Sequence, residues 1–191
     1  MTTIASPSTE PNAKFNGLNV TDITNLAARI QQHQDYGQFQ FRARNQWIDG
    51  ALTRSFIQNF YAGGKENTAR TRALVLDSDQ PHFLGGSSTA ANPVEQILHA
   101  LGSCLTTTLV YHASVAGIDV DSVDTNSIGH LDARGFFGIS NEVSKGYKKI
   151  SVAMKVKSKA SVETLREMAL HSPVYDMLSK ALEVELNIST Q

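Results

Sequence analysis

The longest run of helix-periodic apolar residues in the chain covers residues 92–117. Asn92 is a preferred N-cap residue, Pro93 suits the first helical position, and Glu95 falls three residues after the cap. Apolar residues then recur at steps of three and four, and Gly117 is a residue that commonly ends a helix in the left-handed conformation. The pattern predicts a helix of about 24 residues, roughly 36 Å long. Because the helix carries few charges, we expect it to be buried at the centre of the core.

Polar residues interrupt this helix before it reaches the ~18 continuous apolar residues of a membrane span. The side away from the large apolar residues consists of small ones: Ala100, Gly102, Ser103, Thr106 and Thr107. Such a face can accept a second backbone at close range. Pairing of two copies through their central helices explains the small residues, so we predict a homodimer with a large, partly intertwined interface.

Alternating apolar and polar positions predict strands on both sides of the central helix. Before it, a short amphipathic helix capped by Thr21 is expected over residues 21–33, followed by three antiparallel strands at residues 38–48, 51–62 and 68–77. After it, we expect strands at residues 122–133 and 147–159. A helix should then start at Ser161, with Val162 facing inward, and a second helix should run from Ser172-Pro173 to about Ala181. A last strand is expected at residues 183–189. This order predicts an α+β fold with helices on one side of antiparallel sheet.

Composition suggests how the chain is divided. Residues 1–18 are rich in Ser, Thr, Pro and Asn and are expected to form a flexible arm, whereas residues 19–191 are of ordinary size for one domain. The fifteen residues 77–91, just before the central helix, have the composition of a loop. A loop of that length either borders a functional site or is a flexible connector.

The charge balance and the single cysteine exclude several classes of function. Seventeen basic residues stand against eighteen acidic ones, without a basic tract, so neither nucleic acid nor a membrane surface is an expected partner. One cysteine rules out an intrachain disulfide, and the N-terminus lacks a signal-peptide pattern, so we expect a cytoplasmic protein. The six histidines lack ligand spacing and there is no phosphate-binding or dinucleotide motif, so no metal or cofactor is expected.

Cys104 lies in the middle of the central helix and is the first candidate for chemistry. A reactive cysteine must be held as a thiolate, and the helix start, about eleven residues away, is too far to help. The cation must come from elsewhere, and four arginines are expected in the preceding strands: Arg44, Arg54, Arg70 and Arg72. Glu95 can hold such an arginine, but capping already accounts for it, and it points to the opposite side of the helix from Cys104. The alternative is that Cys104 is an inert core residue.

The run NPVEQILHALGSC at residues 92–104 resembles the central-helix motif of the OsmC/Ohr superfamily (osmotically inducible protein C and organic hydroperoxide resistance protein). Gly85-Gly86, AGIDVDSVD after the helix and SPVYDML near the end of the chain support the resemblance, which covers residues 38–189. It implies an OsmC-like fold, an intertwined homodimer with two active sites at the subunit interface, and attack by Cys104 on the O–O bond of an organic hydroperoxide. An arginine and a glutamate beside the thiolate stabilise its charge in that family. Arg54, just after the Asp49-Gly50 turn, is our first candidate for the arginine, and Glu95 for the glutamate, although it stands one position later than in the family.

The sequence departs from the peroxidase branches of that superfamily at Ser172, where they have a second, resolving cysteine. The resemblance therefore predicts a one-cysteine cycle, in which an external thiol resolves the sulfenic acid of Cys104, as part of oxidative stress defence. The competing hypothesis is a non-catalytic dimer that binds a small apolar or thiol-containing ligand at the subunit interface.

Overall fold

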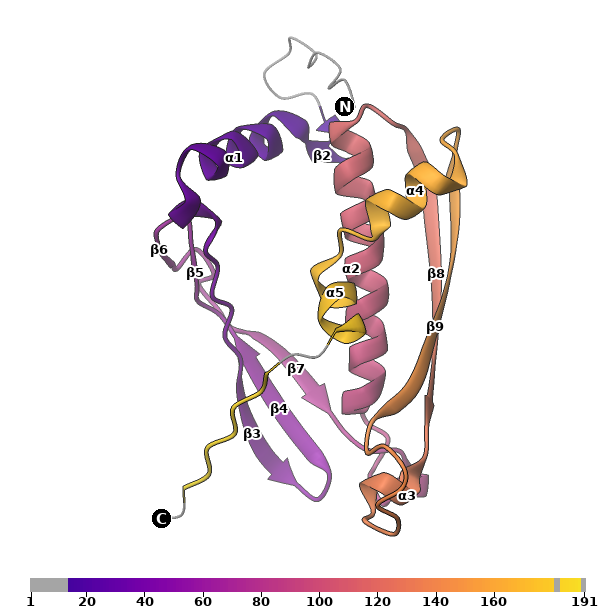
Figure 1. Cartoon of the computed structure of the whole chain (residues 1–191). Helices are drawn as coiled ribbons and strands as arrows, with labels where there is room; N and C mark the ends of the chain where they lie inside the picture. Colours follow the sequence, from indigo (N-terminus) through magenta and orange to yellow (C-terminus); the bar gives the residue numbers. More distant parts are fainter. Residues whose placement is uncertain (1–13, 181–182, 190–191) are drawn as a thin grey trace. The chain divides into compact units, whose positions relative to one another are not determined.

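The computed structural model describes residues 14–180 and 183–189, which form two compact units (Figure 1). One unit comprises Asn19–Ile97 and is called the N-terminal unit below. The other comprises Lys14–Leu18 together with the chain from Leu98 onward, and is called the C-terminal unit. Most of the arm predicted for residues 1–18 lies outside the described residues.

The N-terminal unit begins with helix α1, Val20–Gln32, which the sequence predicted with a start one residue later. Its N-cap is Asn19, whose side chain accepts a hydrogen bond from the Asp22 backbone N–H at 3.2 Å, so the expected cap at Thr21 is wrong. A short 3₁₀ helix, η1, follows at Gln34–Gly37. None of the side chains of α1 is buried within this single chain.

Three antiparallel strands of this unit form one sheet in the order β3, β4, β7, as the sequence predicted, but the first and the third each start about six residues later than expected. Their bounds are β3 Arg44–Asp49, β4 Leu52–Ile57 and β7 Leu74–Ser78. The strand expected over residues 51–62 is interrupted at Gln58 and Asn59, which lie in no strand, and a turn at Gly63 and Gly64, both with positive φ, then reverses the chain. Its second part instead pairs as a separate hairpin, β5 Phe60–Ala62 with β6 Lys65–Asn67. Because β7 starts only at Leu74, Arg70 and Arg72 precede it and do not lie in a strand, contrary to the prediction.

The loop between β7 and the central helix is ordered around a buried carboxylate. Asp79 accepts hydrogen bonds from the backbone N–H groups of Gln80, Ser87 and Thr89 and from the Thr89 hydroxyl. These bonds, that of the Thr89 N–H first, lower the pKa of the Asp79 carboxyl. The loop also passes so close to itself that a Cβ at Gly86 would collide with the Gln80 carbonyl. Within it lies a short 3₁₀ helix, η2, His82–Leu84.

The central helix α2 spans Pro93–Val115 and is one residue shorter than predicted. Gly117 adopts φ +68°, and its N–H and that of Ile118 bond back to the carbonyls of Ser114 and Ala113 at 3.2 and 2.8 Å. This is a Schellman cap, as the glycine indicated. The buried stripe of the helix consists of Leu101, Leu105, Leu109, Ala113 and Ser114. Only this stripe is buried, whereas the sequence predicted a helix buried at the centre of the core.

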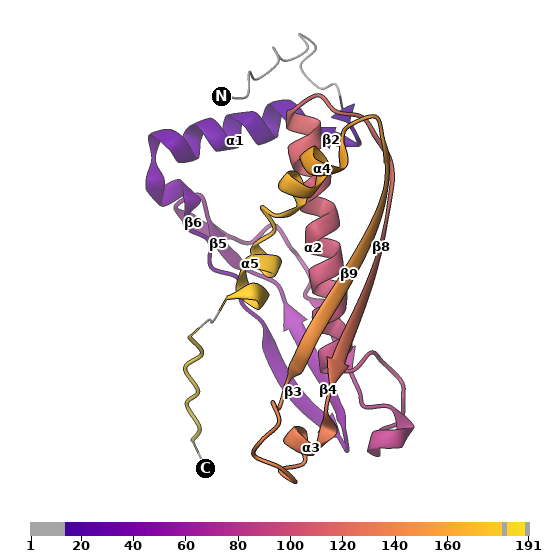
Figure 2. The same ribbon diagram turned by 45° about the vertical axis from the view of Figure 1, so that its right-hand side comes forward.

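A long hairpin runs alongside α2 in the C-terminal unit (Figures 1 and 2). It consists of β8, Val120–Leu131, paired with β9, Tyr147–Ser158, and the short helix α3, Ala133–Phe136, lies in the connection between them. The expected alternation in β9 is confirmed, because its apolar face packs against the leucines of α2: Ile150, Val152, Met154 and Val156. Helix α4, Val162–Ala169, adds Leu165 and Ala169 to this core, and helix α5, Pro173–Ser179, follows.

Residues 14–18 form a small hairpin, unlike the predicted arm, with β1 Lys14–Phe15 and β2 Leu18–Asn19 joined by Asn16-Gly17. The Asn16 side chain bonds Ser114 and Ile118 and accepts from the Val120 N–H. These three bonds attach the hairpin to the end of α2 and the start of β8.

Two further predictions are wrong. Val162 is 74% exposed and borders the open hollow among α2, β9 and α4 that is described below, instead of packing into the core. Residues 183–189 are extended but join no strand among the described residues, and α5 ends at Ser179, while Ala181 lies outside those residues. Among the described helices, none is long and apolar enough to cross a membrane.

Candidate functional site

Cys104 lies on α2 at the edge of the buried stripe, half-buried between Leu101 and Leu105. Its Sγ atom is 4.0 Å from the hydroxyl of Thr108, one turn further along the helix. The two leucines belong to the core and fix the rotation of the helix, so Cys104 lies beside the buried stripe.

Arg54 is held by a carboxylate that the sequence did not single out. Its Nε and NH2 atoms donate to the two oxygens of Asp77 at 2.7 and 2.8 Å, across the β4–β7 pair. The side-chain hydrogen bonds of this pair raise the pKa of Arg54 and lower that of Asp77. Because 41% of the Arg54 side chain remains exposed, its remaining donors are open to another acceptor. Gln96 donates to the Asp77 carbonyl at 2.8 Å and thereby joins the end of β7 to the start of α2.

Glu95 has the capping role that its spacing indicated. Its Oε2 atom accepts from the Asn92 N–H at 2.9 Å, and its own N–H donates to Asn92 Oδ1 at 2.8 Å. The structure therefore gives Glu95 to the helix start and pairs Arg54 with Asp77. Arg54 and Glu95 belong to the N-terminal unit, and Cys104 belongs to the C-terminal unit.

Two of the other candidate arginines lie against aromatic rings. The guanidinium of Arg44 is 4.5 Å from the ring centre of Phe56, and that of Arg70 is 5.1 Å from the ring centre of Phe60. Both contacts are cation–π interactions at exposed positions, which hold these cations close to their own sheet or loop.

Ser172, at the position that the resemblance assigns to a second cysteine, is a buried cap. It is 0% exposed, and its hydroxyl accepts from the Tyr175 N–H at 3.2 Å at the start of α5. The preceding residue, His171, stacks on His112 of α2 with ring centres 4.4 Å apart. Burial, and to a smaller extent the charge of His171, lower the pKa of His112.

The C-terminal unit contains two hollows beside α2. The first is a polar trough of about 550 Å³ along the small-residue face, where the Thr106 and Thr125 hydroxyls are 2.8 Å apart. Its small residues include Gly102, Ser103, Thr106 and Thr107 of α2 with Thr125 and Ser127 of β8. The second, called the apolar cleft below, has about 390 Å³ and lies among α2, β9, α4 and α5. Its lining includes Leu105, Leu109, Val152, Met154 and Leu165, with Arg166 as its charged residue. Within residues 14–180 and 183–189, no group of three or more potential metal ligands occurs.

These features define an α+β protein built around one long helix, with a single half-buried cysteine in the middle of that helix. The family model of the OsmC-like proteins matches residues 85–187, which contain this helix, the β8–β9 hairpin and the two helices that follow. The chain therefore belongs to the OsmC-like family.

Solved structures of two OsmC-like proteins share this fold at low sequence identity, and a third solved structure is less similar. An OsmC-like protein from Mycoplasma pneumoniae is 13% identical with a TM-score of 0.55, covering 74% of this chain and 89% of its own. An OsmC-like protein of unknown function from Vibrio cholerae is 17% identical with a TM-score of 0.51, covering 75% and 95%. An organic hydroperoxide resistance protein from Legionella pneumophila is 21% identical with a TM-score of 0.47, covering 72% and 88%. No curated protein sequence matched.

Proposed function

We propose that this protein reduces organic hydroperoxides through Cys104 in a one-cysteine cycle with an external thiol, and that it acts as a cytoplasmic homodimer. The position of Cys104 carries the proposal. The family's central helix presents this one cysteine half-buried, with a hydroxyl beside the sulfur and a core that fixes its orientation.

The cycle has three balanced steps. The Cys104 thiolate attacks the terminal oxygen of ROOH, which breaks the O–O bond, gives the sulfenic acid and releases RO⁻, and RO⁻ takes a proton from water to become the alcohol. One external thiol then condenses with the sulfenic acid to a mixed disulfide and water. A second external thiol attacks that disulfide, which restores the Cys104 thiol and releases the oxidised reductant. An external thiol is needed because Ser172 cannot form a disulfide.

Arg54 and Glu95 keep in this proposal the roles of charge-stabilising arginine and its acidic neighbour. Arg54 is suited to its role because Asp77 fixes the guanidinium while some of its donors stay exposed. Glu95 is already bonded at the helix start, so its expected contribution is positional, through the helix start that it shares with Gln96 and Asp77.

The homodimer is supported by what a single chain leaves uncovered. The buried residues that the structure describes in the N-terminal unit are Ser78, Asp79 and Asn92, all polar. Large apolar side chains of the same unit are exposed: Phe39, Phe41, Trp47, Leu74 and Val75. Exposed apolar surface of this kind marks an interface, and the small-residue face of α2 borders an open hollow of about 550 Å³. A monomer in light scattering at micromolar concentration would contradict the homodimer.

The test of the peroxidase activity measures the Cys104 thiol directly. We expect wild-type protein to consume cumene hydroperoxide with dithiothreitol far faster than free cysteine does, and to form a sulfenic acid that dimedone traps. Cys104→Ser should lose both signals. Arg54→Gln should lower the second-order rate constant, whereas Arg72→Gln, a matched arginine outside the sheet, should not. Alkylation of Cys104 with the rate and pH dependence of free cysteine, together with no excess peroxide consumption, would refute the proposal.

A second candidate function is a non-catalytic dimer that binds a small apolar or thiol-containing ligand. Ser172 favours it, because the position of the second cysteine has become a buried helix cap. Saturable binding of an apolar fluorescent probe that persists in Cys104→Ser, in a protein without peroxidase activity, would support this candidate over the first.

A further inference from the structure

We propose that the Thr108 hydroxyl and the His112 imidazole form a proton relay, which takes the proton from the Cys104 thiol and so supplies the thiolate. The inference rests on the proposed function, because it names the groups that activate the sulfur for that reaction. Neither group has to contact the peroxide, so both belong to positioning residues.

The first link of the relay is the contact between Cys104 and Thr108. The two residues are one turn apart on α2, and the Sγ atom lies 4.0 Å from the Thr108 hydroxyl, within hydrogen-bonding reach of a sulfur atom. Thr107 and Ser114 of the same helix use their hydroxyls differently, because each donates to the backbone carbonyl four residues earlier, at 2.7 and 2.6 Å. The Thr108 hydroxyl instead faces the sulfur, so it can accept the S–H proton and donate its own proton onward.

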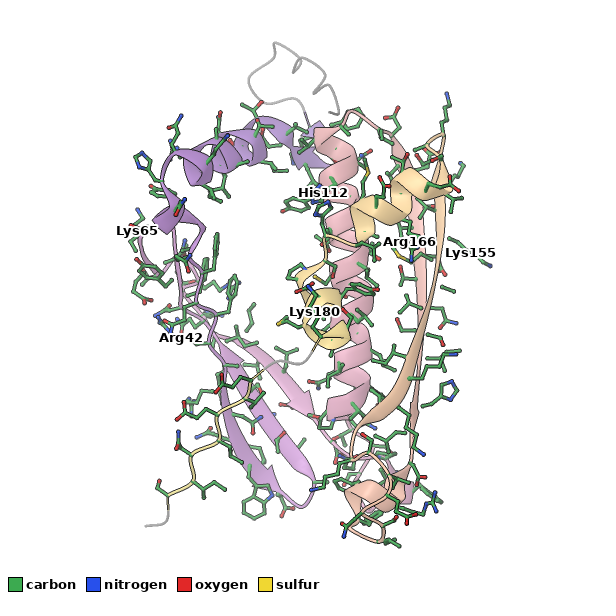
Figure 3. The ribbon with its side chains drawn as sticks, viewed as in Figure 1. Arg42, Lys65, His112, Lys155, Arg166 and Lys180 are labelled. Atoms are coloured by element: carbon green, nitrogen blue, oxygen red, sulfur yellow. The ribbon has the colours of Figure 1, made fainter. Side chains whose placement is uncertain are left out.

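The second link is His112, one further turn along α2. Residues four apart are neighbours on a helix surface, and a helical side chain leans over the turn that precedes it. The His112 imidazole therefore leans toward Thr108, and Figure 3 shows His112 at the edge of α2 that lies away from the β8–β9 hairpin. Leu105 and Leu109 of the same two turns line the apolar cleft. The relay thus runs beside the core and not through it.

His171 holds the His112 ring and keeps it neutral. The two rings stack with their centres 4.4 Å apart and their planes 18° apart, and His171 adjoins the buried cap Ser172. Of the titratable groups around His112, His171 faces it from the connection between α4 and α5, and Tyr111 precedes it on α2. Burial, followed by the charge of His171, lowers the pKa of His112, so the imidazole is free to accept a proton at neutral pH.

The proton transfers balance over the cycle. The thiol proton moves to the Thr108 oxygen while the hydroxyl proton moves to the imidazole, which leaves a thiolate and an imidazolium. The thiolate attacks ROOH, and the released RO⁻ takes a proton from water as in the proposed cycle. The hydroxide formed in that step takes the proton of the imidazolium, which restores neutral His112.

The pH profile of Cys104 alkylation by iodoacetamide tests the relay in the full chain. We expect the wild-type protein to react at neutral pH through the thiolate–imidazolium pair, and His112→Gln and Thr108→Val to lose this reactivity. At about pH 7 both variants should react at least about fivefold more slowly, whereas at about pH 10 all rates should converge, because the thiol then ionises unaided. The double variant should be no slower than the slower single variant, since both interrupt the same relay.

Matched controls are Thr107→Val, whose hydroxyl bonds a carbonyl, and His130→Gln at an exposed position of β8, and both should keep the wild-type profile. Equal rates in wild type and both relay variants at neutral pH would overturn the inference. A loss of equal size at every pH would also overturn it, because that result indicates damage to the fold. Losses that multiply in the double variant would overturn it as well.

The outcome for the relay is separate from the outcome for the proposed function, because alkylation does not involve peroxide. A protein that consumes cumene hydroperoxide but gives one of the contrary profiles keeps the proposed function and loses the relay. A protein with the expected profile that does not consume cumene hydroperoxide keeps the relay and loses the proposed function.

Discussion

The hairpin at residues 14–19 gives a quantitative prediction, because one side chain attaches it to the end of α2 and the start of β8. Asn16 donates to the Ser114 hydroxyl at 3.1 Å and the Ile118 carbonyl at 2.9 Å, and accepts from the Val120 N–H at 3.0 Å. Three hydrogen bonds at about 0.5–1.5 kcal/mol each, in a partly exposed site, contribute about 2 kcal/mol to the free energy of unfolding. We expect Asn16→Gly to lose about that amount.

Asn16→Ala should cost more, because residue 16 adopts φ +48°. Asn and Gly tolerate this left-handed conformation, whereas Ala adopts it only with strain. The added strain is about 1 kcal/mol, so the expected loss is about 3 kcal/mol. The measurement is urea unfolding at one fixed protein concentration, with Asn126→Ala as the control at an exposed position of β8, expected within about 0.5 kcal/mol of wild type. If Asn16→Gly and Asn16→Ala both unfold like wild type, the hairpin is not attached as described.

Three further predictions concern the helices. Ser172→Ala should lower the free energy of unfolding by about 1 kcal/mol in urea unfolding, because it removes the N-cap of α5; an unchanged value would contradict the capping role. Leu105→Ala should cost about 3 kcal/mol in the same measurement, because its side chain is buried in the core, and a loss below about 1 kcal/mol would contradict that packing. His171→Asn should raise the pKa of His112 part of the way to its ordinary value in an NMR titration, since burial, the larger cause, remains. The pKa of His112 is lower in the folded protein than in the unfolded one. Its contribution to the free energy of unfolding is therefore complete at a pH above the ordinary pKa and is lost as the pH falls through the folded pKa. A free energy of unfolding that is independent of pH across that range would refute this.

The local chemistry of the sequence predicted α2 and the β8–β9 hairpin well. The Asn92 cap, the Gly117 end and the alternation in β9 are determined by neighbouring residues, and the structure confirms each. The Asn16-Gly17 pair was an equally local signal for a tight hairpin turn, but the polar composition around it favoured an arm. Predictions about how far a strand extends and which way a side chain faces were less accurate: the strand expected over residues 51–62 is divided, and the side chain of Val162 is exposed.

The candidate site likewise combines features that neighbouring residues predicted with features that only the folded chain brings together. The motif around Cys104 indicated the family and the helix, and the family model confirms the family. Asp77 was not found from the sequence, because its role depends on lying opposite Arg54 across two strands that are 23 residues apart in the chain. The buried state of Ser172 likewise depends on how α4 and α5 pack on α2.

The sequence by itself thus determined the helix that carries the cysteine, the strand alternation and the identity of the one thiol, since each depends on residues within a few positions of one another. Only the tertiary structure decided that Arg54 is held by Asp77, that Ser172 is buried, and that the apolar side chains of residues 183–189 are exposed. Those outcomes depend on strand register and burial, which bring together residues that are distant along the chain.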